Sequence, residues 1–168
     1  AWGGDLAAIP DAAYRDTDVI AFLELHIEQG PVLEQARVPL GIVTSIIGQQ
    51  RALVSFVGNA AHAGTTPMTM RQDAGVAVAR WVARVAEYAR GIDELRATVG
   101  RITLQPGARN VVPGRAEASL DLRHSAGIVA RAALAQLIDD ARAIAAEEGC
   151  LVELSEHSAQ SSVPMTPE

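Results

Sequence analysis

The feature that most restricts how this chain can fold is the order in which two kinds of apolar repeat follow one another from residue 51 onward. Apolar residues recur at every second position in strand-length segments and at every third or fourth position in helix-length segments. Their order is strand, helix, strand, strand, helix, strand. This order predicts an α+β domain of the ferredoxin-like β-α-β-β-α-β type, with a four-stranded antiparallel sheet and two helices on one face.

Four segments carry the strand pattern, at residues 51–57, 98–105, 115–123 and 151–155. Apolar side chains that alternate along a strand should all face the same side of the sheet. In the first segment Ala52, Val54 and Phe56 should share one face, opposite Leu53, Ser55 and Val57. In the third segment Ala118, Leu120 and Leu122 should share one face, opposite Glu117, Ser119, Asp121 and Arg123. The uncovered face and the edges of such a sheet would be available to another domain or subunit.

Two segments carry the helix pattern. The first should begin at Thr66-Pro67, where a capping hydroxyl precedes a proline, and should run to about Arg90, before Gly91. Its buried face should consist of Ala74, Val78, Trp81, Val85 and Tyr88. Ser125 should cap the second helix, which Gly149 closes. The inner face of that helix should consist of Leu134, Leu137, Ile138, Ala141 and Ile144.

The N-terminal third has weaker patterns. Residues 1–17 are rich in Gly, Ala, Pro and Asp and predict a loop with one helical turn. Residues 19–27 are mostly apolar and fit either a helix or a buried strand, because a short apolar run has no diagnostic period. A short helix at 32–36 and a strand at 41–47 are expected to follow.

Charge and composition exclude several classes of protein. The net charge is −6, from 14 basic and 20 acidic residues, and no basic cluster suited to nucleic acid is present. The single cysteine cannot form an internal disulfide, and no apolar stretch reaches membrane-spanning length. These features predict a soluble, cytoplasmic protein. Because the chain starts at Ala1 and stops at Pro167-Glu168 without completing an element, we expect it to be a fragment.

Two histidines are candidates for chemistry. His26 follows an apolar run and sits beside Glu24 and Glu28, which suits a metal ligand with orienting neighbours, although a structural histidine is the commoner explanation. His62 lies among Ala and Gly residues before the expected helix start. It could donate a hydrogen bond to negative charge that develops on a carbonyl oxygen, or it could be an incidental loop residue.

Two further polar residues lie at a turn and on a strand. Asn110 stands between two Pro/Gly breaks, where an amide could contact a ligand or serve turn formation alone. Arg123 stands beside Asp121 and could bind a carboxylate with two hydrogen bonds, although a solvated ion pair is more common. His124 and His157 have no supporting context and are expected at the surface or at strand ends.

Four segments taken together carry a resemblance to a known family. They read ELHIEQGP, GNAAHAGTTPM followed by RQDA, GARNVVPG, and LDLRH. In this order they closely resemble the allantoate amidohydrolase and N-carbamoyl-L-amino acid hydrolase family, within the aminoacylase and carboxypeptidase-like metallohydrolases. The resemblance covers about residue 20 to the end. It implies a catalytic domain with two zinc or manganese ions, interrupted by an inserted domain that forms a homodimer and closes over the substrate.

The resemblance also implies boundaries and roles. Residues 1–47 would be an edge of the α/β catalytic domain, residues 48–160 the dimerisation and lid domain, and residues 161–168 the return to the catalytic domain. His26 would be a metal ligand and Gln29 would line the substrate pocket. The inserted-domain residues that bind substrate, in some cases in the partner subunit's site, would be His62, Asn110 and Arg123. Of these, His62 would polarise the scissile carbonyl and Arg123 would hold the substrate carboxylate.

The chain also departs from the family pattern. The other metal ligands and the general-base glutamate belong to upstream HxD and EE motifs and a downstream histidine, which this sequence lacks. We therefore expect a metal-dependent hydrolase of non-peptide C–N bonds in the parent protein and no activity in this piece alone. Allantoate, an N-carbamoyl amino acid or a ureidopropionate would each fit. The alternative is a non-catalytic ferredoxin-like module that binds a small molecule or oligomerises; a dipeptidase or aminoacylase is a weaker match.

Overall fold

A computed structural model describes residues 4–15 and 17–165, and the chain divides after Ile42 into two compact units. The first unit contains the 3₁₀ helix η1 (Leu6–Ala12) and the short helix α1 (Val32–Ala36), as expected. Residues 19–27 form neither helix nor strand, and all their side chains are exposed. The expectation of a helix or buried strand there is wrong for this chain. Regular structure in a short apolar segment depends on packing against another element, and nothing in this unit buries these residues.

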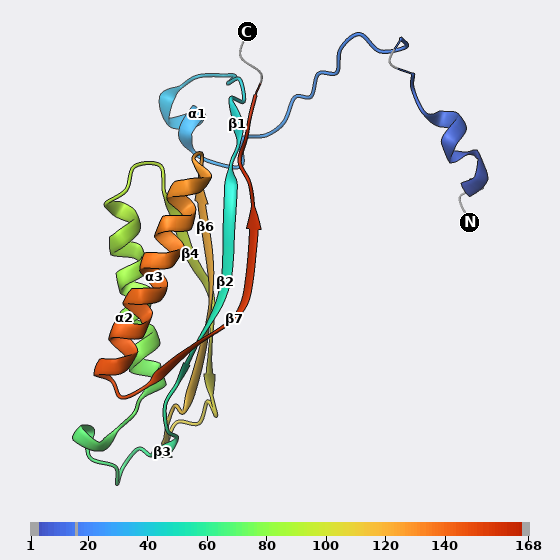
Figure 1. Cartoon of the computed structure of the whole chain (residues 1–168). Coiled ribbons are helices and arrows are strands. Elements are labelled where there is room, and N and C mark those ends of the chain that lie inside the picture. The colour runs from blue at the N-terminus through green and yellow to red at the C-terminus, as the bar shows by residue number, and fades with distance from the viewer. Residues whose placement is uncertain (1–3, 16, 166–168) are drawn as a thin grey trace. The chain divides into compact units, whose positions relative to one another are not determined.

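The second unit is built around a long antiparallel sheet (Figure 1). Its strands are β2 (Gly48–Val57), β4 (Arg96–Gln105), β6 (Arg115–His124) and β7 (Leu151–Gln160), in the order β4-β6-β2-β7. Helices α2 (Ala74–Arg90) and α3 (Gly127–Glu147) lie on one face of it (Figure 1). The expected mixture of helices with an antiparallel sheet is confirmed.

Two short strand pairs accompany the main sheet and were not expected. Strand β1 (Ser45–Ile46) pairs with β8 (Val163–Pro164), and β3 (Ala61–His62) pairs with β5 (Val111–Val112). Of the strand expected at 41–47, only the two residues of β1 are in a strand. Within the described ranges, no helix combines the length and apolar character needed to cross a bilayer.

The core lies between the sheet and the two helices. Its centre is Trp81 of α2, which is fully buried and packs against Phe56 of β2 with ring centroids 5.7 Å apart. The Trp81 indole N–H donates to the carbonyl oxygen of Leu137 in α3 at 2.8 Å, which joins the two helices. The expected alternation is confirmed, since the side chains predicted to share one face in each of β2 and β6 are all buried: Ala52, Val54, Phe56, Ala118, Leu120 and Leu122.

Helix α2 begins seven residues later than the Thr66-Pro67 pair suggested. Asp73 is its N-cap, and one carboxylate oxygen accepts from the backbone N–H groups of Gly75 at 2.9 Å and Val76 at 3.2 Å. Pro67 precedes only the single 3₁₀ turn η2 (Met68–Met70). The extended backbone of Arg71, with φ −82° and ψ 144°, separates that turn from the helix. The expected start was wrong because the Asp73 carboxylate, and not the Thr66 hydroxyl, satisfies the free N–H groups of the first helical turn.

Helix α3 also begins without the cap that its sequence suggested. The Ser125 hydroxyl donates to the Glu94 carboxylate at 2.6 Å, and no side chain caps the helix. His124 ends β6 in a buried position, where its Nδ1 accepts from Ala126 N–H at 2.8 Å and its Nε2 lies 3.1 Å from the Asp93 carbonyl. It is a strand-end residue, as expected, but it ties two loops together instead of facing solvent.

Candidate functional site

The segments that carry His62 and Asn110 are neighbours in space although 48 residues separate them in the sequence. His62 in β3 is the register partner of Val111 in β5. The N–H of Ala63 donates to the carbonyl oxygen of Asn110 at 2.9 Å. Both side chains are exposed, so this end of the unit presents an imidazole and an amide on adjacent loops. The structure thus brings together two of the residues that the sequence predicted.

The ring of His62 is held in one tautomer by its own loop. The backbone N–H of Gly64 donates to His62 Nδ1 at 3.1 Å, so Nδ1 is the acceptor nitrogen. In a neutral imidazole the single proton then lies on Nε2, which becomes a hydrogen-bond donor. A Cβ at position 64 would lie 3.2 Å from His62 Cε1, so glycine suits this close approach. The arrangement can donate one hydrogen bond to an oxygen of a bound molecule.

Arg71 supports the same loop and was not singled out from the sequence. Its Nη2 donates to the Ala63 carbonyl at 2.7 Å and its Nε to the Thr66 carbonyl at 3.1 Å. The loop leaves the sheet at Gly58, where any Cβ would lie 2.1 Å from the Gln72 carbonyl oxygen. The position of Arg71, three residues after the GTTPM segment and at the start of RQDA, was the only clue in the sequence. Its guanidinium holds two carbonyl groups of the loop that directly follows His62.

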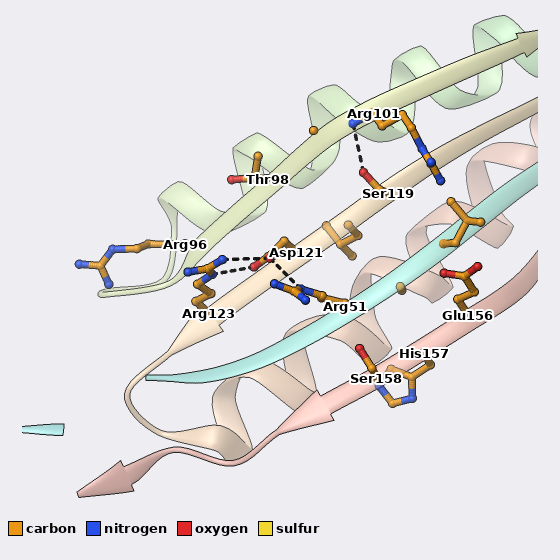
Figure 2. A pocket seen from close by; sticks show the side chains of 14 residues that line it. Arg51, Arg96, Thr98, Arg101, Ser119, Asp121, Arg123, Glu156, His157 and Ser158 are labelled. Atoms are coloured by element: carbon orange, nitrogen blue, oxygen red, sulfur yellow. Dashed lines mark hydrogen bonds and ion pairs between the residues drawn. The ribbon is translucent and has the colours of Figure 1, made fainter. Parts of the chain in front are cut away.

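Arg123 lies on the face of the sheet that the helices leave uncovered, paired with Asp121. Its Nε donates to Asp121 Oδ1 at 2.9 Å and its Nη2 to Oδ2 at 3.2 Å (Figure 2). Asp121 also accepts from Arg51 Nε at 3.3 Å and from Gln49 Nε2 at 2.6 Å, both on β2. The carboxylate is therefore shared by donors from two strands.

The charged side chains of this group shift one another's pKa values. Burial raises the pKa of the Asp121 carboxyl, but hydrogen bonds from Arg123 and Arg51 outweigh burial, and the pKa lies below its ordinary value. The hydrogen bond to Asp121 in turn raises the pKa of the Arg123 guanidinium. Both groups are therefore ionised throughout the neutral range. Sequence reasoning found the Arg123–Asp121 pair but missed Arg51 and Gln49, because they approach from another strand.

A shallow depression surrounds this group on the uncovered face (Figure 2). Its volume is about 810 Å³. The charged residues that line it are Arg51, Arg96, Arg101, Arg123, Asp121 and Glu156. Four guanidiniums thus face two carboxylates, in a chain whose net charge is −6. The depression therefore concentrates positive charge and suits an anion.

The loops that carry His62 and Asn110 lie at one end of β6, and the Arg123–Asp121 pair lies at the other. Arg123 pairs with Gln49 near one end of the strand, and Arg115 pairs with Val57 near the other, next to β3 and β5 (Figure 1). From Arg115 to Arg123 the strand rises by about 26 Å, at roughly 3.3 Å per residue. His62 and Arg123 of one chain are therefore not parts of a single small pocket.

The remaining candidates lie in the first unit. His26 is exposed, and its Nδ1 lies 2.6 Å from the Ile27 carbonyl oxygen. Since a carbonyl can only accept, Nδ1 carries the proton and Nε2 keeps a lone pair. The Glu28 carboxylate accepts from Val32 and Leu33 N–H groups at 3.0 and 2.9 Å, which places it at the start of α1. Gln29 has a positive φ of 56°.

No metal centre is complete in this part of the protein. Across residues 4–15 and 17–165, no group of three or more His, Cys, Asp or Glu side chains could hold an ion. The described residues therefore do not fit a two-metal site by themselves.

Comparison with known proteins identifies the family. Residues 45–149 match the peptidase dimerisation domain, which is more than half of the chain. The chain belongs to the peptidase dimerisation domain family. The matched range contains β1 to α3 and therefore both the His62 and the Arg123 regions of this dimerisation domain.

Relatives of the dimerisation domain confirm the resemblance seen in the sequence. The chain is 49% identical over 121 residues to N-carbamoyl-L-amino-acid amidohydrolase of Paenarthrobacter aurescens, which covers 71% of this chain and 29% of that protein. It is 50% identical over 114 residues to allantoate amidohydrolase of Bacillus subtilis (strain 168), covering 67% and 27%. The chain thus spans less than a third of these curated relatives.

A solved structure agrees with these relatives. It is an amidase of the hydantoinase/carbamoylase family from Burkholderia multivorans, with a TM-score of 0.80 and 38% sequence identity. The match covers 84% of this chain and 35% of that one. Fold and sequence therefore identify the same family.

Proposed function

We propose that this chain is the dimer-forming lid of a two-metal amidohydrolase that cleaves a ureido or linear amide C–N bond, as in allantoate or an N-carbamoyl-L-amino acid. The activities for which the two relatives are named support this substrate class. The strand order β4-β6-β2-β7 supports a ferredoxin-like lid. The assignment of residues 1–47 and 161–168 to the catalytic domain follows the resemblance.

The observation that carries the proposal is the fixed ring of His62. Hydrolysis of a ureido or amide group places negative charge on the carbonyl oxygen in the transition state. Because Gly64 N–H occupies Nδ1, the Nε2–H of a neutral His62 is available to donate to that oxygen. A donor held in place before the reaction stabilises the developing charge without rearrangement. Asn110, on the adjacent loop, would add an amide contact to the same substrate.

Arg123 would bind the substrate carboxylate. Its Nε and Nη2 each donate one hydrogen bond to Asp121. The hydrogens on Nη1 and the second hydrogen on Nη2 can therefore donate to a substrate carboxylate. A guanidinium held by one carboxylate is already oriented, so less side-chain freedom is lost when a second carboxylate binds. Asp121 is thus a positioning residue in this scheme.

Each active site would draw on two chains. An N-carbamoyl amino acid is no longer than two extended residues, about 7 Å. The His62 and Arg123 ends of one chain are separated by the length of β6, about 26 Å. One substrate can therefore contact both residues only if they come from different subunits, which gives the dimer a direct role in catalysis.

The metal ions would be held mainly by residues of the intact enzyme outside this chain, with His26 contributing its Nε2 and Gln29 lining the pocket. When bound, such a pair makes a water molecule acidic enough to act as a nucleophile near neutral pH. The protonated Nδ1 of His26, at 2.6 Å from the Ile27 carbonyl, is the arrangement that orients a histidine ligand.

The proposal is tested by ammonia release from the intact enzyme loaded with manganese or zinc, with allantoate and a panel of N-carbamoyl-L-amino acids. We expect turnover that a chelator abolishes. His62→Ala should lower kcat by about a hundredfold or more, the usual effect of removing one oxyanion donor. Arg142→Ala, which removes an exposed arginine of α3 paired with Asp139 and away from both proposed substrate contacts, is the control and should keep its activity. Bound metal without turnover of any of these substrates would contradict the proposal and favour a binding module.

A further inference from the structure

We propose that Arg51 and Arg123 together bind a ligand with two carboxylates, so that acidic ureido acids are the preferred substrate class. The substrate class rests on the function proposed above. The anion site itself rests only on the geometry of the sheet.

The register of the strands places two guanidiniums at one carboxylate. Arg51 of β2 is the direct partner of Asp121 in β6, and Arg123 follows two residues later on the same face. Side chains opposite each other on one face of an antiparallel pair lie within contact distance. Figure 2 shows both guanidiniums reaching the Asp121 carboxylate from their separate strands.

The charges of this group do not balance. Asp121 accepts from both arginines and from Gln49, so one negative charge serves two positive ones. Arg96, the register partner of Arg123 on β4, adds further positive charge along the same face. One cation of the pair therefore has no full counter-ion within the described residues, and an anionic ligand would complete the group.

Each of the two guanidiniums also has N–H donors that Asp121 does not use. Arg51 uses only Nε within the described residues, which leaves both terminal nitrogens for a ligand. Arg123 uses Nε and Nη2, which leaves Nη1. Since Asp121 lies between the two donor groups, they suit two separate carboxylates better than a single one. The side chain of Arg51 is 60% exposed, so a ligand can reach it.

Binding is measured first, by calorimetry on the intact enzyme with succinate and with butyrate, which has the same chain length and one carboxylate. We expect succinate to bind more tightly by about tenfold or more, because it engages both guanidiniums. Arg51→Ala and Arg51→Gln should both remove that preference. Arg142→Ala, which removes an exposed arginine of α3 paired with Asp139, is the control and should keep it. Equal binding of the two acids, or a preference that survives both Arg51 variants, would overturn the anion site.

Kinetics then separate this inference from the proposed function. The ratio of kcat/KM for N-carbamoyl-L-aspartate to that for N-carbamoyl-L-alanine should fall about tenfold in Arg51→Ala. Hydrolysis of both substrates with an unchanged ratio would overturn the inference and leave the amidohydrolase function standing. Arg51-dependent succinate binding without hydrolysis of allantoate or of any N-carbamoyl-L-amino acid in the panel would support the anion site while refuting the proposed function.

Discussion

Mixing two inactive variants should restore activity if each active site uses His62 from one chain and Arg123 from the other. His62→Ala removes the oxyanion donor and should lower kcat by about a hundredfold or more. Arg123→Ala removes the carboxylate partner, and the loss of such a pair costs about 2 to 5 kcal/mol. The two variants prepared separately should therefore be nearly inactive.

The size of the recovery follows from the geometry. About 26 Å of β6 separates the two ends of one chain, so the complete sites must be composite. In a heterodimer of the two variants, one site has both residues intact and the other has neither. Random association of equal amounts makes about half of the dimers mixed, so about a quarter of all sites should recover.

Ammonia release after co-expression, or after dissociation and reassociation of the purified variants, measures this recovery. The control mixes His62→Ala with the double variant that lacks both His62 and Arg123, because no dimer of that mixture has a complete site. Activity in the test mixture that stays at the level of the separate variants would refute the composite site. That result would mean that His62 and Arg123 of one chain act in the same site, which contradicts their separation along β6.

Two further predictions concern stability. Asp73→Ala should lower the free energy of unfolding by about 1 kcal/mol, because it removes the cap of α2, whereas Thr66→Ala should change it much less; urea unfolding compares the two. The lowered pKa of Asp121 stabilises the fold at pH values above the ordinary pKa of 3.8, and this contribution is lost as the pH falls through the lower folded value. Asp121→Asn should accordingly flatten the decline of unfolding free energy between about pH 5 and pH 2, and an unchanged slope would contradict the ion-pair explanation.

The core could be predicted because its pattern is repeated many times along the chain. In β6, Ala118, Leu120 and Leu122 alternate with polar residues, and in α2 Trp81 and Val85 fall on the apolar stripe. Because several residues support the same strand or helix in such a pattern, one ambiguous position does not change the predicted element.

The sequence-based predictions were wrong where they depended on a single local feature. The Thr66-Pro67 pair has the local chemistry of a helix start, but the Asp73 carboxylate forms the cap. Residues 19–27 are apolar enough for a helix or strand, but their side chains remain exposed. Local sequence cannot say whether another surface will cover a segment, and that decides its structure.

By itself, the sequence determined the order of the elements, the faces of the core and the family, because these depend on neighbouring residues and on contiguous motifs. It also singled out His62, Asn110 and Arg123. Only the tertiary structure decided which residues stand beside them: strand register places Arg51 and Gln49 at Asp121, and the β3-β5 pair places Ala63 against Asn110. The tertiary structure also placed the His62 and Arg123 regions at opposite ends of β6. Register and pairing depend on contacts between residues far apart in the chain, which no local pattern encodes.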